Sequence, residues 1–227
     1  GHRDAIALLI DAGAATTMEG RRIYEGFQPI DMALWENCYW SRRPDGAALA
    51  DYLIGCGVPY DLSISAALGD QVQVERLLAE APAAVNKARP NGRRAVSAAA
   101  QAGHETIVKL LLDAGADPTL SEGAACPQGH GLWAAAYGGH YTIAEMLLRH
   151  NADPNAGVES CGPPVAVDDR AMRYLMYRYG GRMSPMAIAY RGDLDSLNAY
   201  SREALEAENA GQEGGLYKVA LRSGDWD

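Results

Sequence analysis

Two stretches of this chain, GHETIVKLLLDAGADPTL at residues 103–120 and GGHYTIAEMLLRHNADPNA at residues 138–156, align with each other without strain. A third copy, GHRDAIALLIDAGAAT, begins at Gly1, and a looser copy, GDQVQVERLLAEAPAAVN, begins at Gly69. Self-similarity of this kind is the signature of a repeat architecture. The repeat therefore decides the fold, and the other features of the sequence are interpreted from it.

Each copy has the apolar spacing of an amphipathic helix. In the copy from Gly103, polar Glu105 and Lys109 fall outside a stripe with i, i+3, i+4 spacing. The stripe consists of Ile107, Val108, Leu110, Leu111 and Leu112. Gly115 follows the last turn, where a left-handed residue commonly ends a helix.

A shorter, alanine-rich segment precedes three of the copies: LSISAALG at residues 62–69, RAVSAAAQAG at 94–103 and GLWAAAYGG at 131–139. Alanine has the best helix propensity and lets two helix backbones approach closely. Each unit is therefore predicted to be a short helix, a tight glycine turn and a second, amphipathic helix. One such pair cannot bury its own apolar face, so the pairs must stack.

These units resemble the ankyrin repeat family. Its pattern has a first helix like TPLHLAA, which QPIDMAL at residues 28–34 matches, then a GH turn and a second helix ending in LLL-x-GA. The resemblance implies an all-α helix-turn-helix solenoid with short β-hairpin fingers and a concave face made of fingers and first helices. We expect residues 1–227 to form a single array of about six to seven repeats, partial terminal ones included. The best-matching repeats are at 62–157, a lengthened repeat is at 27–61, and divergent repeats are at 158–227.

The spacing of the repeats departs from regularity in an informative way. The expected turn positions lie 44, 24, 34, 36, 29, 24 and 32 residues apart; they are Gly1, Asp45, Gly69, Gly103, Gly139, Asp168, Gly192 and Gly224. The long interval indicates an insertion after Leu34 that carries Trp35, Tyr39, Trp40, Arg42 and Arg43. The two 24-residue intervals leave no room for fingers at residues 58–60 and 181–183. Fingers are expected at 14–27, 82–93, 116–129 and 152–161.

Two further details follow from the same alignment. Pro163 and Pro164 should shorten or disrupt the first helix of their repeat, because proline lacks the backbone N–H of a helix interior. The chain begins within a second helix and ends just after a first helix, with no initial Met. Terminal repeats normally need complete polar caps, so either the parent protein is longer, which is our expectation, or these half-repeats are themselves the caps.

Composition excludes several classes of function. The net charge of −9 and the pI near 5.0 argue against nucleic-acid binding through a generic phosphate-binding surface. No apolar run approaches the roughly 18 residues of a bilayer span, and no signal peptide is recognisable. The four cysteines lack CxxC spacing, so we expect free thiols and neither metal nor cofactor. A cytoplasmic monomer without membrane contact is the resulting expectation.

No catalytic motif is present. The pairing of His104 with Glu105 is interpreted as part of the repeat's own turn, with the histidine hydrogen-bonding locally. Asp168 and Asp169 are adjacent, so on a helix they point about 100° apart and suit N-capping better than paired catalysis. A hydrolase site after Ala156 remains a third hypothesis, and we expect no enzymatic activity in this chain.

Candidate binding residues lie in the central repeats. The basic cluster ARPNGRR at residues 88–94 lies on an expected finger, either as a solvated tip or as a contact for an acidic partner segment. Trp133 replaces the histidine of the family's first helix, with Tyr137 one turn later. This pair is either an exposed recognition surface or, through Trp133, filler between repeats. The predicted contact residues are Arg89, Asn91, Arg93, Arg94, Gln128, His130, Trp133 and Tyr137.

The resemblance implies a protein–protein interaction module that binds a partner protein on its concave face and catalyses nothing. The alternative hypothesis is a regulatory or substrate-recruiting segment of a larger enzyme, which the incomplete terminal repeats favour.

Overall fold

The computed structural model divides the chain into two compact units, residues 1–180 and 181–227. It describes residue 4 and residues 28–34, 45–123, 130–157, 162–198, 201 and 203. The Gly1 copy of the repeat, the finger at 14–27, the insertion after Leu34 and the turn at Gly224 lie outside these residues or almost entirely so.

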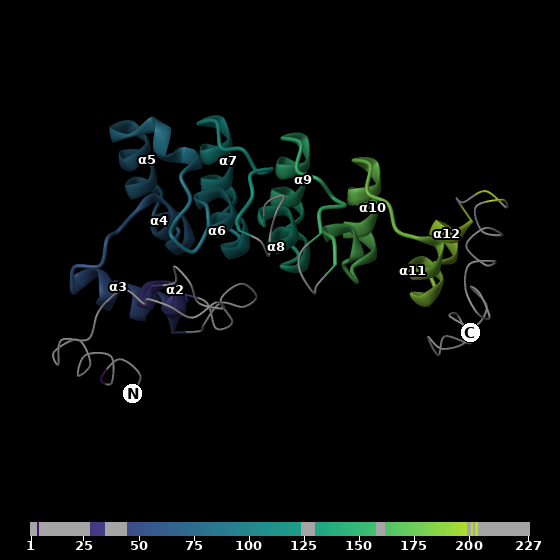
Figure 1. The fold of residues 1–227 in the computed structure, drawn as a ribbon, viewed down its shortest axis with the longest axis horizontal. Helices are drawn as coiled ribbons and strands as arrows, with labels where there is room; N and C mark the ends of the chain where they lie inside the picture. Colours follow the sequence, from purple (N-terminus) through teal and green to yellow (C-terminus); the bar gives the residue numbers. More distant parts are fainter. Residues whose placement is uncertain are drawn as a thin grey trace. The chain divides into compact units, whose positions relative to one another are not determined.

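The first unit is a succession of helix pairs (Figure 1). The first and second helices of the pairs are α2 (Pro29–Leu34) and α3 (Gly46–Gly55), α4 (Leu62–Leu68) and α5 (Gln71–Glu80), α6 (Ala95–Ala102) and α7 (Glu105–Asp113), α8 (Gly131–Tyr137) and α9 (Tyr141–Arg149), and the 3-10 helix η2 (Pro164–Ala166) with α10 (Arg170–Arg178). A second 3-10 helix, η1 (Pro82–Asn86), follows α5. The first helices α4, α6 and α8 pack on one another in chain order. The expected stack of helix pairs is confirmed in this part of the chain.

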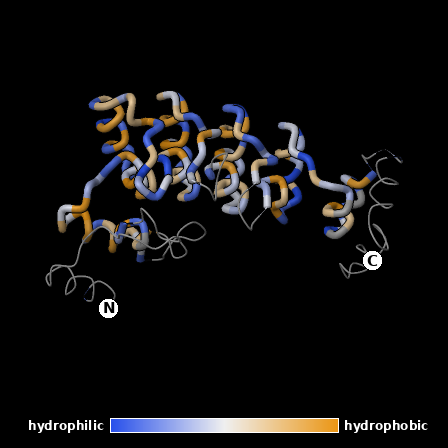
Figure 2. The backbone as a smooth tube through the Cα atoms, in the orientation of Figure 1, coloured by the Kyte–Doolittle hydropathy of each residue, from blue (hydrophilic) through white to orange (hydrophobic). Residues whose placement is uncertain are grey.

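The buried faces of the second helices follow the apolar stripe. On α7 the buried residues are Ile107, Val108, Leu111 and Leu112, and on α9 they are Ile143, Ala144, Leu147 and Leu148. Apolar and polar residues both occur within each of these helices, as Figure 2 shows. The first helices bury small residues instead, since Ala98, Ala99 and Ala100 of α6 are all fully enclosed. Small side chains are what allow α6 to lie against both α4 and α8.

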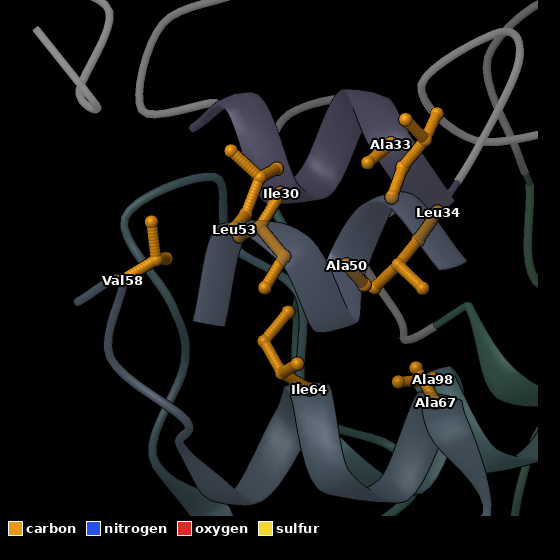
Figure 3. Close-up of a cluster of buried hydrophobic side chains, with 10 residues drawn as sticks. Ile30, Ala33, Leu34, Ala50, Leu53, Val58, Ile64, Ala67 and Ala98 are labelled. Carbon is orange, nitrogen blue, oxygen red and sulfur yellow. The ribbon is translucent and has the colours of Figure 1, made fainter. Parts of the chain in front are cut away.

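A cluster of buried side chains joins α2 and α3 to the next pair (Figure 3). The cluster includes Ile30 and Leu34 of α2, Leu53 of α3, Ile64 of α4 and Val58 of the connecting segment. Each of these five side chains is at most 4% exposed. The helices α2 and α3 are therefore packed on α4.

The glycine–histidine turns link successive units. Gly69 and Gly103 end α4 and α6 in the left-handed conformation, with φ of 84° and 77°. A Cβ atom on Gly69 would lie 2.8 Å from the ring of His104, and one on Gly103 would lie 2.7 Å from the ring of His140. His104 Nε2 also lies 3.2 Å from the carbonyl oxygen of Ala67. The His104 ring thus covers the turn of the preceding repeat, a contact that the expectation of a local hydrogen bond did not include.

The connections between pairs are either short or long. α3 and α4 are joined by residues 56–61 and α10 and α11 by residues 179–184, so each connection is six residues long. Neither has room for a finger, which agrees with the 24-residue intervals. The connections at 81–94, 114–130 and 150–163 are longer. Among the described residues none is a β-strand, so the β-hairpin form of the fingers stays a prediction.

Two local expectations are confirmed. The first helix that contains Pro164 is reduced to the three-residue 3-10 helix η2. Asp169 caps α10, because its Oδ1 accepts from the Met172 N–H at 2.8 Å. Asp169 is thus a helix cap, and Asp168 beside it is exposed.

The second unit contains α11 (Pro185–Tyr190) and α12 (Leu194–Leu197) among its described residues. Ser184 caps α11 by accepting from the Ala187 N–H, and Pro185 occupies the first helical position. Asp193 accepts from both the backbone N–H and the hydroxyl of Ser196 at the start of α12. Residues 191–193 join these two helices.

Candidate functional site

Arg89, the first residue of the predicted contact set, is buried in the connection between α5 and α6. Its Nε donates to Asp31 Oδ1 at 3.1 Å, and its Nη2 donates to Gln28 Oε1 at 3.0 Å. Its Nη1 donates to Asp61 Oδ2. Asp61 in turn caps α4 by accepting from the N–H groups of Ser63 and Ile64. A single guanidinium group therefore ties the starts of α2 and α4 to the connection that follows α5.

A tight turn presents Arg89 to these partners. The Arg89 N–H donates to the carbonyl oxygen of Arg93 at 2.9 Å, and the Gly92 N–H donates back to the carbonyl oxygen of Arg89 at 2.8 Å. Asn91 Oδ1 accepts from the Arg93 N–H at 3.0 Å. Gly92 has φ of 85°, and a Cβ atom there would lie 2.9 Å from the carbonyl oxygen of Glu122. Asn91 and Gly92 thus shape the turn, and glycine is required by both conformation and space.

Arg93 and Arg94 lie against the next connection. Glu122 is buried there, accepts from the Arg94 N–H at 3.1 Å and takes a hydrogen bond from Ser97. The guanidinium of Arg94 donates to the carbonyl oxygens of Asn86 and Ser121. Arg93 is 1% exposed and donates to Gln101. These groups join the connection before α6 to the connection after α7.

The expectation of a solvated basic finger tip is therefore wrong for Arg89 and Arg93. Carboxylates and amides of the chain itself surround both side chains, because a buried guanidinium needs partners to offset its lost hydration. The sequence reasoning overlooked Asp31, Asp61 and Glu122. The sequence around Asp31 did indicate a buried carboxylate, since Asp31 lies within the apolar helix QPIDMAL beside buried Ile30. A carboxylate in such a position requires a buried cationic or N–H partner.

Glu122 makes the stability of the stack depend on pH. Burial raises the pKa of its carboxyl group from 4.5 to about 7, and Arg93 and the hydrogen bond from Ser97 offset only part of this effect. A pKa that is higher in the folded state stabilises the fold as pH falls through that value. Between pH 8 and pH 5, Glu122 should therefore raise the free energy of unfolding by about 2–3 kcal/mol.

Urea unfolding of the native chain and of Glu122→Gln, followed by circular dichroism at both pH values, measures this effect. Other groups titrate equally in both proteins, so the difference between the two proteins isolates Glu122. We expect the native chain to gain stability relative to the variant as the pH falls. A difference that stays constant between pH 5 and pH 8 would contradict the assignment.

The aromatic part of the predicted set forms a stack on α8. The ring centroids of Trp133 and Tyr137 are 4.4 Å apart with an interplanar angle of 21°, and His130 lies 5.4 Å from Trp133. His130 and Trp133 are buried, whereas Tyr137 is 41% exposed. Trp133 therefore packs within the stack of repeats and supports one exposed tyrosine ring. Gln128 lies outside the described residues.

The eight predicted residues thus do not share one surface role. Arg89, Asn91 and Arg93 stabilise the connection between α5 and α6, and His130 and Trp133 lie beneath Tyr137. Within the described part of the chain, no group of three or more His, Cys, Asp or Glu side chains could hold a metal ion. No helix among those residues is long and apolar enough to cross a membrane.

Comparison with known proteins identifies the repeat. A family model described as ankyrin repeats, in three copies, matches residues 51–157. This range runs from α3 to the connection after α9 and includes every predicted contact residue. No curated protein matches the chain.

Proposed function

Because residues 51–157 make this chain a member of the ankyrin repeat family, whose repeats generally serve as protein-interaction modules, we propose that it binds a partner protein without catalysing a reaction. The proposed contact surface is the concave face of the central repeats, where the first helices and the connections between pairs meet. The partner would be recognised by a rigid surface that exists before binding.

Tyr137 is the observation that supports this proposal most directly. It is the exposed member of a three-ring stack on the first helix α8, and the buried Trp133 ring holds it at 4.4 Å. Tyrosine is enriched among residues that dominate binding energy. A side chain that is already ordered loses less conformational entropy when a partner binds.

The buried members of the predicted set would affect binding indirectly, by holding the connections between helix pairs in place. Arg89 and Arg93 fix the connection at 81–94, and Glu122 fixes the connection after α7 by binding the start of α6. Both connections contact the starts of first helices, namely α2 and α4 through Arg89 and α6 through Glu122. The proposed surface therefore owes its rigidity to these ion pairs, while exposed side chains supply the contacts.

Tyr137→Ala tests the proposal. The Tyr174→Ala variant is a matched control, since Tyr174 is 40% exposed on the second helix α10. Affinity capture with mass spectrometry, using the native chain and both variants as bait, should return a partner that Tyr137→Ala alone fails to retain. The measured affinity for that partner should fall by more than roughly tenfold in Tyr137→Ala, as expected of a hot-spot residue, with helical circular dichroism unchanged.

Two results would count against this surface. If Tyr174→Ala weakens binding as much as Tyr137→Ala does, the partner does not specifically contact the first helices. If binding survives Tyr137→Ala but is lost when residues 37–43 are shortened to a tight turn, the insertion is the contact site.

A further inference from the structure

A cleft of about 500 Å³ lies between the start of α4, the end of α5 and the connection after α5. Most of its lining is apolar, from Leu62, Leu77, Ala81, Ala84, Ala88 and Pro90. Clefts of this volume with apolar walls and a few polar groups are the usual form of a ligand pocket. Asp61, the last residue of the short connection at 56–61, also lines it.

The polar groups of the cleft are mostly donors. Lys87 and Arg89 line it together with the hydroxyl-bearing Ser63, and Asp61 is its one carboxylate. Asp61 is already engaged by Arg89 and by two backbone N–H groups of α4. Among the described residues, no carboxylate lies within ion-pair distance of Lys87. Asp31 and Asp61 neutralise Arg89, so Lys87 is the lining cation of the cleft that has no carboxylate partner among the described residues.

Ser63 independently indicates that the cleft binds a hydrogen-bond acceptor. It is 4% exposed, and its hydroxyl makes no hydrogen bond to any described part of the chain. One repeat later, Ser97 occupies the same place on α6 and donates its hydroxyl to the carboxylate of Glu122, which comes from the connection after α7. In the earlier repeat the residue that reaches the helix start from the following connection is Arg89, which has no acceptor to offer.

We propose that this cleft binds a glutamate side chain of a partner protein, which places its carboxylate by Ser63 and Lys87 as Glu122 places its own by Ser97. The inference rests on the proposed protein binding but concerns a different surface from Tyr137. The apolar walls accept the methylene groups of the glutamate and an adjacent aliphatic residue. The Ser63 hydroxyl and the Lys87 ammonium group supply a neutral and a charged hydrogen bond to the carboxylate.

The test uses the full chain and two blocked tripeptides, acetyl-leucyl-glutamyl-leucinamide and its glutaminyl counterpart, titrated by two-dimensional ¹H–¹⁵N NMR. The glutamyl peptide should shift the amide signals of residues 61–63 and 77–90 and saturate. Its affinity should exceed that of the glutaminyl peptide by about tenfold, the difference expected for a charge-assisted hydrogen bond.

Variants assign the contacts. Ser63→Ala removes a hydroxyl that has no partner among the described residues, so the fold should be retained while affinity for the glutamyl peptide falls several-fold. Lys87→Gln should lower that affinity by about tenfold, and the matched control Lys109→Gln, at an exposed lysine of α7, should leave it unchanged.

Each other outcome overturns the proposal. Equal binding of the two peptides shows that no carboxylate is recognised. Equal affinity for sodium propionate shows a site for free carboxylates and not for a protein segment. Signal shifts outside the cleft, or loss of peptide binding in Tyr137→Ala, would show that the peptide binds elsewhere. Neither result would bear on whether Tyr137 contacts the partner protein, which the capture experiment measures separately.

Discussion

Arg89→Ala should lower the free energy of unfolding by about 3–5 kcal/mol, the cost of removing one member of a buried ion pair. Asp31 is 0% exposed, so without the guanidinium its carboxylate stays buried with only the Gln28 N–H as a described donor. Asp61 is less affected, because 39% of its side chain is exposed and two helix N–H groups remain bound to it. Urea unfolding followed by circular dichroism measures the loss.

The control for Arg89→Ala is Arg76→Ala. Arg76 pairs with Glu80 on the surface of α5, with both side chains more than half exposed, and such pairs contribute about 0–1 kcal/mol. The double variant Arg89→Met, Asp31→Asn should be almost as stable as the native chain, since no uncompensated charge then remains in the core. If Arg89→Ala destabilises the chain no more than Arg76→Ala, the buried pair does not hold the connection.

Leu111→Ala should destabilise the chain by about 2–5 kcal/mol, as expected when a fully buried leucine is truncated and leaves a cavity. Leu111 is 0% exposed in the middle of α7, where helices on both sides limit collapse around the vacated volume. The same unfolding experiment measures this change.

Leu110→Ala is the matched control, because Leu110 precedes Leu111 on the same helix and is only partly buried. Its truncation should cost clearly less, since less apolar surface returns to water. Equal effects at the two positions would mean that α7 is rotated relative to the apolar stripe and that the register is wrong.

The parts of the fold that periodicity governs could be predicted from the sequence. The stripe that includes Ile107, Val108 and Leu111 is buried as its spacing predicts, since helix geometry alone places those side chains on one face. The short connections at 56–61 and 179–184 follow from counting residues. The reduction of a first helix to η2 follows from the chemistry of proline.

The candidate site was harder to predict because its partners are distant in sequence. Arg89 and Asp31 are 58 residues apart, and Arg94 and Glu122 are 28 apart, so no local pattern joins them. The basic run ARPNGRR has the composition of a solvated loop, and only the stacking of repeats turns its arginines inward. For Trp133 the sequence left two possibilities, and burial selects packing between repeats for Trp133 while leaving Tyr137 exposed.

Three of the contacts between units share a direction. The His104 ring covers the turn at Gly69, Arg89 binds Asp61, and Glu122 binds the start of α6. In every case the later residue in the chain satisfies a group in the earlier unit. During synthesis, therefore, α6 and α7 leave the ribosome before their contacts with Glu122 and His140 can form. The pair has all of these contacts only after both residues have been added. Each helix pair is thus stabilised by the segment that is synthesised after it.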